Sequence, residues 1–256
     1  MMTRSAPAQT GMSDGEIETM RSVEDDLWWY RGLRGHVVRS IKPPHPGFSL
    51  LDAGCGTGGM LARVRANFPA AAMTGLDYSE RALELTERRN TGATLEQGSA
   101  DLLPLADAAF DVVLSLDVLV LRGVDDGAAI REMRRVLRPG GTLIVNVAAF
   151  DFLRGSHDAA TNMARRYTRP RLRNLLEQAG FTIENMSYWN MTLLPAVALV
   201  RWTSRQRAEQ PDVQSDLKPI WSPLNAALSV VAHLELAATR VFSLPFGTSL
   251  FVLARK

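Results

Sequence analysis

The 256-residue sequence predicts an α/β fold, in which a mostly parallel sheet carries helices on both of its faces. Short apolar stretches typical of buried strands alternate with longer stretches of helical periodicity between residues 48 and 147. The segment LLDAGCGTGGML at residues 50–61 places four glycines directly after the first of these strands. Strands that alternate with helices call for parallel pairing, because each helix carries the chain back to the edge where the next strand begins.

The segment before the sheet is expected to form a flexible tail and then a helical cap. Residues 1–20 are rich in Ser, Thr, Gly and Met, and they lack the basic and apolar order of a secretory leader. Residues 24–39 space their apolar side chains as a helix does, and the Pro-rich run at residues 43–47 ends this pattern. We therefore expect a tail over residues 1–20 and a cap over residues 21–47.

The central segment supplies five strands and the helices between them. The strands are expected at residues 48–53, 72–76, 93–97, 110–116 and 141–147. The helices are expected at residues 58–67, 79–89 and 126–137. Ser79 suits an N-cap, and Pro139-Gly140-Gly141 suits the end of the third helix.

The remaining chain extends the same domain and interrupts it once. A loop at residues 148–168 precedes a helix at 170–179 and a sixth strand at 181–189. Residues 248–254 are expected to form the closing strand. The sequence thus predicts a single domain over residues 21–256, with its core at 48–190 and 247–256. Residues 191–246 are expected to be a helical insert, with helices at 193–202 and 224–242.

Composition favours a cytoplasmic protein that acts on a small molecule. Lys and Arg exceed Asp and Glu by 29 to 27, which is far from the clustered basic excess of nucleic-acid-binding proteins. Cys55 is the single cysteine, so no intramolecular disulfide can form and a reducing compartment is expected. The longest uncharged stretch, residues 191–200, contains a proline and is too short for a membrane span, so no stable membrane insertion is expected.

The glycine run is compatible with two kinds of cofactor. Gly54, Gly56 and Gly59 satisfy the G-x-G-x-x-G spacing of dinucleotide-binding loops, and Asp77 stands where a ribose-binding acid belongs. This interpretation favours an NAD-type oxidoreductase. Asp52, however, precedes the first glycine, where a carboxylate can meet a cationic amino-acid group, and S-adenosylmethionine has such an ammonium group.

Four sequence blocks resemble the class I S-adenosylmethionine-dependent methyltransferases. They are DAGCGTG at 52–58, GLDYSERALELTERR at 75–89, GSADLLPLADAAFDVVLSLDVL at 98–119 and REMRRVLRPGGTLIV at 131–145. The resemblance implies a Rossmann-like, seven-stranded sheet whose last strand is antiparallel. It also implies that S-adenosylmethionine is the cofactor and S-adenosylhomocysteine the product.

The resemblance assigns cofactor contacts to individual residues. Asp52 and Gly54 would face the methionine part, Asp77 would accept hydrogen bonds from both ribose hydroxyls, and Tyr78 would pack against the adenine. Ala100 would offer its backbone to the adenine; Ser99 stands where much of the family has an acid, which leaves Asp101 as the substitute. The remaining expected cofactor residues are Cys55, Gly56, Gly58, Leu116 and Asp117.

A narrower resemblance points to the acceptor side. The chain is similar to a bacterial methyltransferase type 11/12-like group that has WW(F/Y)RG before the domain and HD…RRYT after the fifth strand. The matching blocks here are residues 28–32, 157–158 and 165–168. Two departures are DVLVL at residues 117–121, where the group commonly has DVLEH, and the lack of a second histidine shortly before Arg165.

Methyl transfer from a sulfonium needs alignment and exclusion of water, and it needs a base only where the acceptor arrives protonated. His157 and Tyr167 are the candidate catalytic residues, because both lie in the loop expected over the cofactor. The alternative for His157 is a hydrogen bond that anchors the loop through Asp158 or an arginine. Trp29, Tyr30 and Arg166 are candidates for acceptor binding, and the alternative for the Trp pair is a place in the core.

The predicted function is methyl transfer to a small, partly apolar or glycosylated metabolite, with no metal ion. The rival hypotheses are a cofactor-binding protein without transferase activity and an NAD-type oxidoreductase. The insert is too apolar for a free surface hairpin, so it is interpreted as a lid over an apolar substrate, as the face of a homodimer or as a membrane-surface helix. The sequence does not separate these three.

Overall fold

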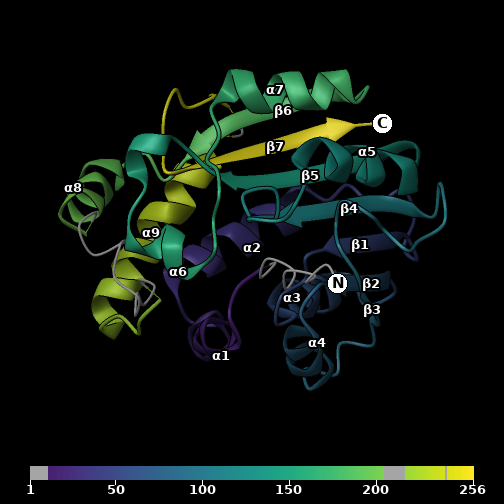
Figure 1. Ribbon diagram of the computed structural model, residues 1–256, viewed down its shortest axis with the longest axis horizontal. Coiled ribbons are helices and arrows are strands. Elements are labelled where there is room, and N and C mark those ends of the chain that lie inside the picture. Colours follow the sequence, from purple (N-terminus) through teal and green to yellow (C-terminus); the bar gives the residue numbers. More distant parts are fainter. Residues whose placement is uncertain (1–10, 205–216, 240) are drawn as a thin grey trace, which may run out of the picture.

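The computed structural model describes residues 11–204, 217–239 and 241–256, and its centre is a seven-stranded sheet (Figure 1). The strand order is β3-β2-β1-β4-β5-β7-β6, in which β7 runs antiparallel to both of its neighbours and β1 to β5 are parallel. The expected sheet and its antiparallel last strand are confirmed. The strands are β1 (Ser49–Ala53), β2 (Ala72–Asp77), β3 (Thr94–Gln97), β4 (Phe110–Leu116), β5 (Leu137–Ala148), β6 (Thr182–Trp189) and β7 (Ser249–Arg255).

Helices cover both faces of the sheet, because consecutive strand residues point in opposite directions. Leu51 in β1 belongs to the core beneath α5 and α7, whereas its neighbour Leu50 belongs to the core beneath α2, α3 and α9. The helices are α1 (Asp14–Val23), α2 (Trp28–Ser40), α3 (Gly59–Asn67), α4 (Glu80–Glu87), α5 (Asp126–Val136), α6 (Ser156–Ala160), α7 (Arg169–Gln178), α8 (Leu194–Ser204) and α9 (Ser222–Ala238), with a 3₁₀ turn η1 (Asp151–Leu153).

The strand order reverses between β1 and β4, and this reversal positions the site. β1 pairs with β2 on one side and with β4 on the other. The chain therefore builds the sheet toward one edge from β1 to β3, and toward the opposite edge from β4 onward. The helix connections therefore diverge at the carboxyl edge and open a crevice there, where ligands of such sheets bind. Asp52, Asp77 and Asp117 all lie at this edge, at the ends of β1, β2 and β4.

The expectation of a flexible tail is wrong for residues 14–20, which belong to α1. Ser13 caps this helix by accepting a hydrogen bond from the Glu16 N–H. Ile17, Met20 and Val23 are buried along one side of it, and Ile17 packs with side chains of α4. Polar composition suggested a tail, but three apolar side chains at helical spacing are enough to dock a short helix. Residues 1–10 lie outside the described residues.

The expected insert does contain two helices, and α9 packs against α2 of the cap. A β-carbon at Gly32 in α2 would lie 3.5 Å from both the Ala232 side chain and the Leu236 side chain. The expected single helix at 24–39 begins only at Trp28, and residues 24–27 form the link to α1. The expected loop at 148–168 contains η1 and α6. The boundaries drawn between cap, core and insert stay a prediction, and residues 205–216 lie outside the described part of the chain.

Leu236→Ala should lower the free energy of unfolding by about 2–5 kcal/mol, the usual cost of a large cavity in a core. Leu236 is 1% exposed, and it packs in the contact between α9 and α2. Leu102→Ala is the control, because Leu102 is 78% exposed and the substitution should change stability by less than about 0.5 kcal/mol. Urea unfolding of both variants checks this, and equal effects would contradict the packing of α9.

Candidate functional site

A cavity of about 690 Å³ opens at the carboxyl edge of the sheet, within the range typical of small-molecule sites. The ends of β1, β2 and β4 line one half of it, together with α1 and α2. The other half is lined by α6, α8, α9 and the start of β7. The two halves form one continuous space, and we call them the cofactor half and the acceptor half.

The glycine-rich loop adopts a conformation that only glycine tolerates. Gly54 has φ +93° and Gly58 has φ +76°, both in the left-handed region. A β-carbon on Gly54 would collide with the Val118 side chain, and one on Gly58 would lie 2.7 Å from Thr86 Cγ2. Gly56 is also left-handed, with φ +54°. The backbone of this loop therefore lines the cavity directly, with no side chain between it and a ligand.

Asp52 presents a buried carboxyl group to the cofactor half. It is 1% exposed, and its Oδ1 accepts no hydrogen bond from any residue that the structure describes. Burial, and then the negative charge of Asp77, raises the pKa of Asp52 to about 8, against the opposing effect of Arg34. A buried carboxylate without a partner is costly, and a cation placed beside it relieves that cost. The group thus suits an ammonium ligand.

Asp77 is held in place by the backbone and keeps capacity for a ligand. Its Oδ2 accepts the Gly56 N–H at 2.8 Å, and its Oδ1 accepts the Ser79 N–H at 2.9 Å. Burial raises its pKa, and these hydrogen bonds act in the opposite direction. Each carboxylate oxygen has a second lone pair, so two hydroxyl donors can still bind. This arrangement suits the two hydroxyls of a ribose.

Most of the other expected cofactor residues also line the cavity; Gly58 is not part of the described cavity wall, and neither is Asp101. The Asp101 carboxylate accepts hydrogen bonds from the Ser99 hydroxyl and from the Asp125 N–H. A contact between Asp101 and the adenine, in place of the family acid, therefore stays a prediction. The residues that do line the cavity are Cys55, Tyr78, Ser99, Ala100, Leu116 and Asp117.

Asp117 stands where the two halves meet, and a buried chain of hydrogen bonds orients it. Its Oδ2 accepts from Asn146 Nδ2 at 2.8 Å, and Asn146 Oδ1 accepts from Trp189 Nε1 at 2.8 Å. Burial raises the pKa of Asp117 to about 7, and the Asn146 hydrogen bond and the Arg166 charge oppose this shift. The backbone of Asp117 is left-handed, with φ +59°. Sequence reasoning missed Asn146 and Trp189, which lie on β5 and β6.

Tyr167 lies in the core in this structure, and its expected catalytic role stays a prediction. Its side chain is fully buried, and its hydroxyl lies 2.7 Å from Asp126 Oδ2 and 3.1 Å from the Leu119 carbonyl oxygen. It packs among the core residues beneath α5 and α7, and it is absent from the described cavity wall. The RRYT block therefore contributes to this loop through buried contacts of Tyr167.

Arg166 lines the cavity, but its guanidinium is already occupied. Its Nε and Nη2 donate to the two oxygens of Asp158 at 2.7 and 3.0 Å, and its Nη1 donates to the Ala149 carbonyl at 2.9 Å. Its role in acceptor binding stays a prediction. Both oxygens of the Asp158 carboxylate are thus hydrogen-bonded to Arg166. His157 itself lies half-buried in the cavity wall, and its catalytic role stays a prediction.

Trp29 and Tyr30 line the cavity from α2, and their role in acceptor binding stays a prediction. The Trp29 ring is stacked on Trp189, with ring centroids 5.6 Å apart, and it meets Tyr30 edge to face at 5.0 Å. The Arg34 guanidinium lies 5.5 Å from the centroid of the Tyr30 ring. Trp29 thus packs on the core and also faces the cavity, so both interpretations of the Trp pair apply.

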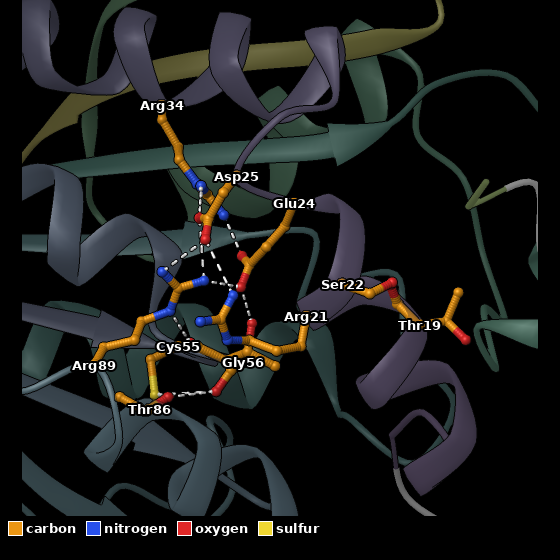
Figure 2. Close-up of polar contacts among 11 residues, drawn as sticks. Thr19, Arg21, Ser22, Glu24, Asp25, Arg34, Cys55, Gly56, Thr86 and Arg89 are labelled. Atoms are coloured by element: carbon orange, nitrogen blue, oxygen red, sulfur yellow. Dashed lines mark hydrogen bonds and ion pairs between the residues drawn. The ribbon is translucent and has the colours of Figure 1, made fainter. Parts of the chain in front are cut away.

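Sequence reasoning also missed an ionic clamp that joins the cap to the glycine-rich loop (Figure 2). We define the clamp as Glu24, Asp25, Arg34 and Arg89. Glu24 is 3% exposed and accepts hydrogen bonds from Arg34, from Arg89 and from the Thr57 hydroxyl. Asp25 accepts from Arg34 at 3.2 Å and from Arg89 at 3.1 Å. Arg89 in turn donates to the Thr57 carbonyl at 2.6 Å.

Comparison with known proteins identifies the central part of the chain. Residues 51–145 match the family described as "Methyltransferase domain". A probable S-adenosylmethionine-dependent methyltransferase of Mycolicibacterium smegmatis is 31% identical over 173 residues, which are 65% of this chain and 64% of that protein. The malonyl-[acyl-carrier protein] O-methyltransferase of Serratia marcescens is 36% identical over 126 residues, 49% of this chain and 48% of that protein. The matched part thus spans less than two thirds of either relative.

Residues 51–145 are thus similar to a methyltransferase domain, and the relative from Mycolicibacterium smegmatis is S-adenosylmethionine-dependent by name. The fold of this methyltransferase domain also occurs in the [4+2]-cyclase SpnF, whose solved structure is 22% identical with a TM-score of 0.58, over 88% of this chain and 80% of that one. The methyltransferase domain contains Asp52, Asp77 and all the glycines of the loop. S-adenosylmethionine, the cofactor that this similarity implies, fits two features of the cavity. One is the Asp52 oxygen that has no hydrogen-bond partner among the described residues, and the other is the backbone of Gly54, which lines the cavity without a side chain.

Cofactor binding should strengthen about ninefold between pH 6 and pH 7. Binding of an ammonium group favours the Asp52 carboxylate, so the free protein, in which the pKa of Asp52 is about 8, must lose a proton on binding. Below pH 7 the cofactor's own amino group stays charged. Calorimetry with S-adenosylhomocysteine measures the affinity at both pH values.

Asp52→Asn is the matched variant for this measurement, because it keeps the shape of the side chain and removes the titration. It should bind more weakly at pH 7 and with much less dependence on pH. Asp107→Asn, at an exposed acid outside the described cavity wall, should behave as the wild type. A flat pH profile in the wild type, or the same slope in Asp52→Asn, would contradict the role of Asp52.

Proposed function

We propose that this chain transfers the methyl group of S-adenosylmethionine to a small, partly apolar metabolite. The observation that supports this best is the continuity of the cavity. Its cofactor half presents the carboxyl groups of Asp52 and Asp77, and its acceptor half is lined mainly by apolar side chains of the insert. A cofactor and an acceptor can therefore lie side by side in one space that is closed to bulk water on several sides.

In this proposal the cofactor half binds three parts of S-adenosylmethionine. Asp52 receives the ammonium group, Asp77 accepts hydrogen bonds from the ribose hydroxyls, and Tyr78 packs against the adenine. The backbone of Ala100 borders the same end of the cavity and offers its polar groups to the base. Bound there, the cofactor supplies a methyl group on a sulfonium, which is already activated for displacement.

The protein then has to orient the acceptor, exclude water and, where the acceptor is protonated, hold the proton that leaves. Trp29 and the insert helices supply apolar walls that exclude water. His157 is our candidate for the proton acceptor. Asp117 is a second one, because Asn146 fixes its carboxyl group at the junction of the two halves. A glycosylated acceptor would need hydroxyl partners, and the polar groups at this junction would supply them.

A cofactor-binding protein without methyl transfer is the second candidate function. The observation in its favour is the shared fold with SpnF, because a fold that serves a [4+2]-cyclase does not by itself establish methyl transfer. An NAD-type oxidoreductase is less well supported. A dinucleotide has no ammonium group for Asp52, whose Oδ1 would stay buried and unpaired.

Calorimetry with S-adenosylmethionine, S-adenosylhomocysteine and NAD separates these candidates. We expect both methionine derivatives to bind and NAD not to bind. Asp77→Ala should weaken the binding of S-adenosylhomocysteine by at least about 1 kcal/mol, the scale of a lost hydrogen bond to a charged group. Asp107→Ala, an exposed acid outside the described cavity wall, is the control. Binding of NAD alone would overturn the proposal. Binding without any methylated product from a metabolite extract would favour the second candidate.

The compartment and the assembly belong to the same proposal. The single cysteine suits a reducing cytoplasm. None of the described helices is long and apolar enough to cross a membrane. The outer side of α9 exposes Val230 and Leu234, and Val241 follows them beyond the helix end; this face would form the contact in a homodimer.

Light scattering should therefore give twice the mass of one chain, and Leu234→Arg should reduce it to a single chain by placing a charge in the contact. Leu102→Arg is the control, because Leu102 is exposed far from α9 along the chain. A single-chain mass for the wild type at tens of micromolar would contradict the homodimer.

A further inference from the structure

The inner side of α8 changes from apolar to cationic along its length. Leu193, Ala196, Val197, Val200 and Arg201 line the cavity. Their spacing of three and four residues places them on one side of the helix, and Leu193 directly precedes its first residue. The stripe offers a ligand four apolar side chains and then one guanidinium group.

The walls that face this stripe are apolar as well. Ile220 and Leu228 border the acceptor half from the segment that leads into α9 and from α9 itself. Leu121, Val124 and Met163 border it from the loops after β4 and α6. Burying apolar surface against such walls is the main source of affinity for a small ligand. An acceptor that fills this half must therefore present a sizeable apolar body.

The cationic end lies at α6. Arg201 is half-buried in the cavity wall, and its positive charge contributes to holding the pKa of Asp158 below its ordinary value. Arg166 engages both oxygens of Asp158, and one of them also accepts the Gly155 N–H at 3.1 Å. Arg166 and Arg201 thus place two guanidinium-bearing residues in the cavity wall.

A guanidinium in a partly buried wall favours an anion, because its planar donors match carboxylate and phosphate oxygens. Figure 1 shows α8 at the same end of the molecule as α6 and α9, and α8 also contacts η1 in the loop that carries α6. The cationic end is therefore part of the acceptor half. The carboxyl groups of the cofactor half lie at the opposite end of the cavity, on β1 and β2.

We propose that the acceptor is amphipathic, with an apolar body along the α8 stripe and an anionic group, carboxylate or phosphate, at Arg201. This inference rests on the proposed function, since it describes the second ligand of the same cavity. Among small and partly apolar acceptors, the inference selects those that have an anionic group at one end. Arg201 is then a specificity-determining residue.

The proposal is tested by calorimetry on the protein saturated with S-adenosylhomocysteine, with three probes that each have one alkyl chain of ten carbons. The probes are decanoate, decyl phosphate and 1-decanol, each kept below the concentration at which it aggregates. We expect at least one anionic probe to bind about tenfold or more tightly than 1-decanol, the scale of a charge-assisted hydrogen bond. The stronger of the two anions identifies carboxylate or phosphate as the head group.

Arg201→Gln should remove this preference and leave the affinity for 1-decanol unchanged, whereas Arg201→Lys should keep part of it. Arg173→Gln is the matched control, because Arg173 is an exposed arginine on α7 paired only with Glu177 in the described contacts. Val197→Trp should weaken all three probes by filling the acceptor half, and Leu234→Trp on the exposed side of α9 should not.

Equal affinity for 1-decanol and both anions, or an unchanged preference for the anions in Arg201→Gln, would contradict the claim that the acceptor has an anionic group at Arg201. Failure of all three probes to bind, or binding that Val197→Trp leaves unchanged, would overturn the whole inference. Normal affinity for S-adenosylhomocysteine in these variants shows that they are folded. Failure of the wild type to bind S-adenosylhomocysteine would instead count against the proposed function, so the two failures are distinguishable.

Discussion

Close packing around the glycine-rich loop is the constraint on which the site depends. Val118 leaves no room for a side chain at Gly54, and Thr86 leaves none at Gly58. The Glu24–Arg34 ion pair does the same at Gly59. The loop is therefore fixed from three directions, by the end of β4, by α4 and by the cap. Because Gly56 donates its N–H to Asp77, fixing the loop also fixes the acid that faces the ribose site. The cofactor half is thus built by backbone contact, and few side chains in it are free to vary.

The ionic clamp fixes the loop from the side of the cap. Its main effect is to position the cap on the loop, and its effect on the stability of the fold is smaller. Removing charges from water costs several kcal/mol per ion, and the attraction between them roughly repays that cost only where every oxygen and donor is satisfied. Glu24 meets this condition, since Arg34, Arg89 and the Thr57 hydroxyl all donate to it. Few other placements of residues 24–27 satisfy so many groups at once. The clamp therefore also sets where α1 lies, and a β-carbon at Gly56 would lie 3.1 Å from Met20 Cε of α1.

Sequence patterns could predict the sheet and the cofactor half, because both depend on local rules. Alternation of strands and helices gives the topology, and glycines beside Asp52 and Asp77 give the loop. The clamp could not be predicted, because Glu24 and Arg89 are 65 positions apart and charged residues on helices are ordinarily solvated. The roles of Tyr167 and Arg166 cannot be decided from the sequence for a related reason. An aromatic hydroxyl and a guanidinium serve a ligand and a buried hydrogen bond equally well, and the sequence does not give their burial. The sequence also does not show that the Asp101 carboxylate faces the Ser99 hydroxyl and the Asp125 N–H.

The two halves of the cavity are under different constraints, and this difference bears on how the fold acquires new functions. The cofactor half is locked to the sheet edge by glycines that accept no substitute. The acceptor half comes largely from α8 and α9, which lie outside the strand and helix alternation and contact the core mainly through α2 and η1. Changes along α8 can therefore alter the acceptor without disturbing the loop. The charges follow the same division, with carboxyl groups at the cofactor end and guanidinium groups at the acceptor end. Any ligand pair that fills both halves must match this polarity, with its cation beside Asp52 and its anion near Arg201.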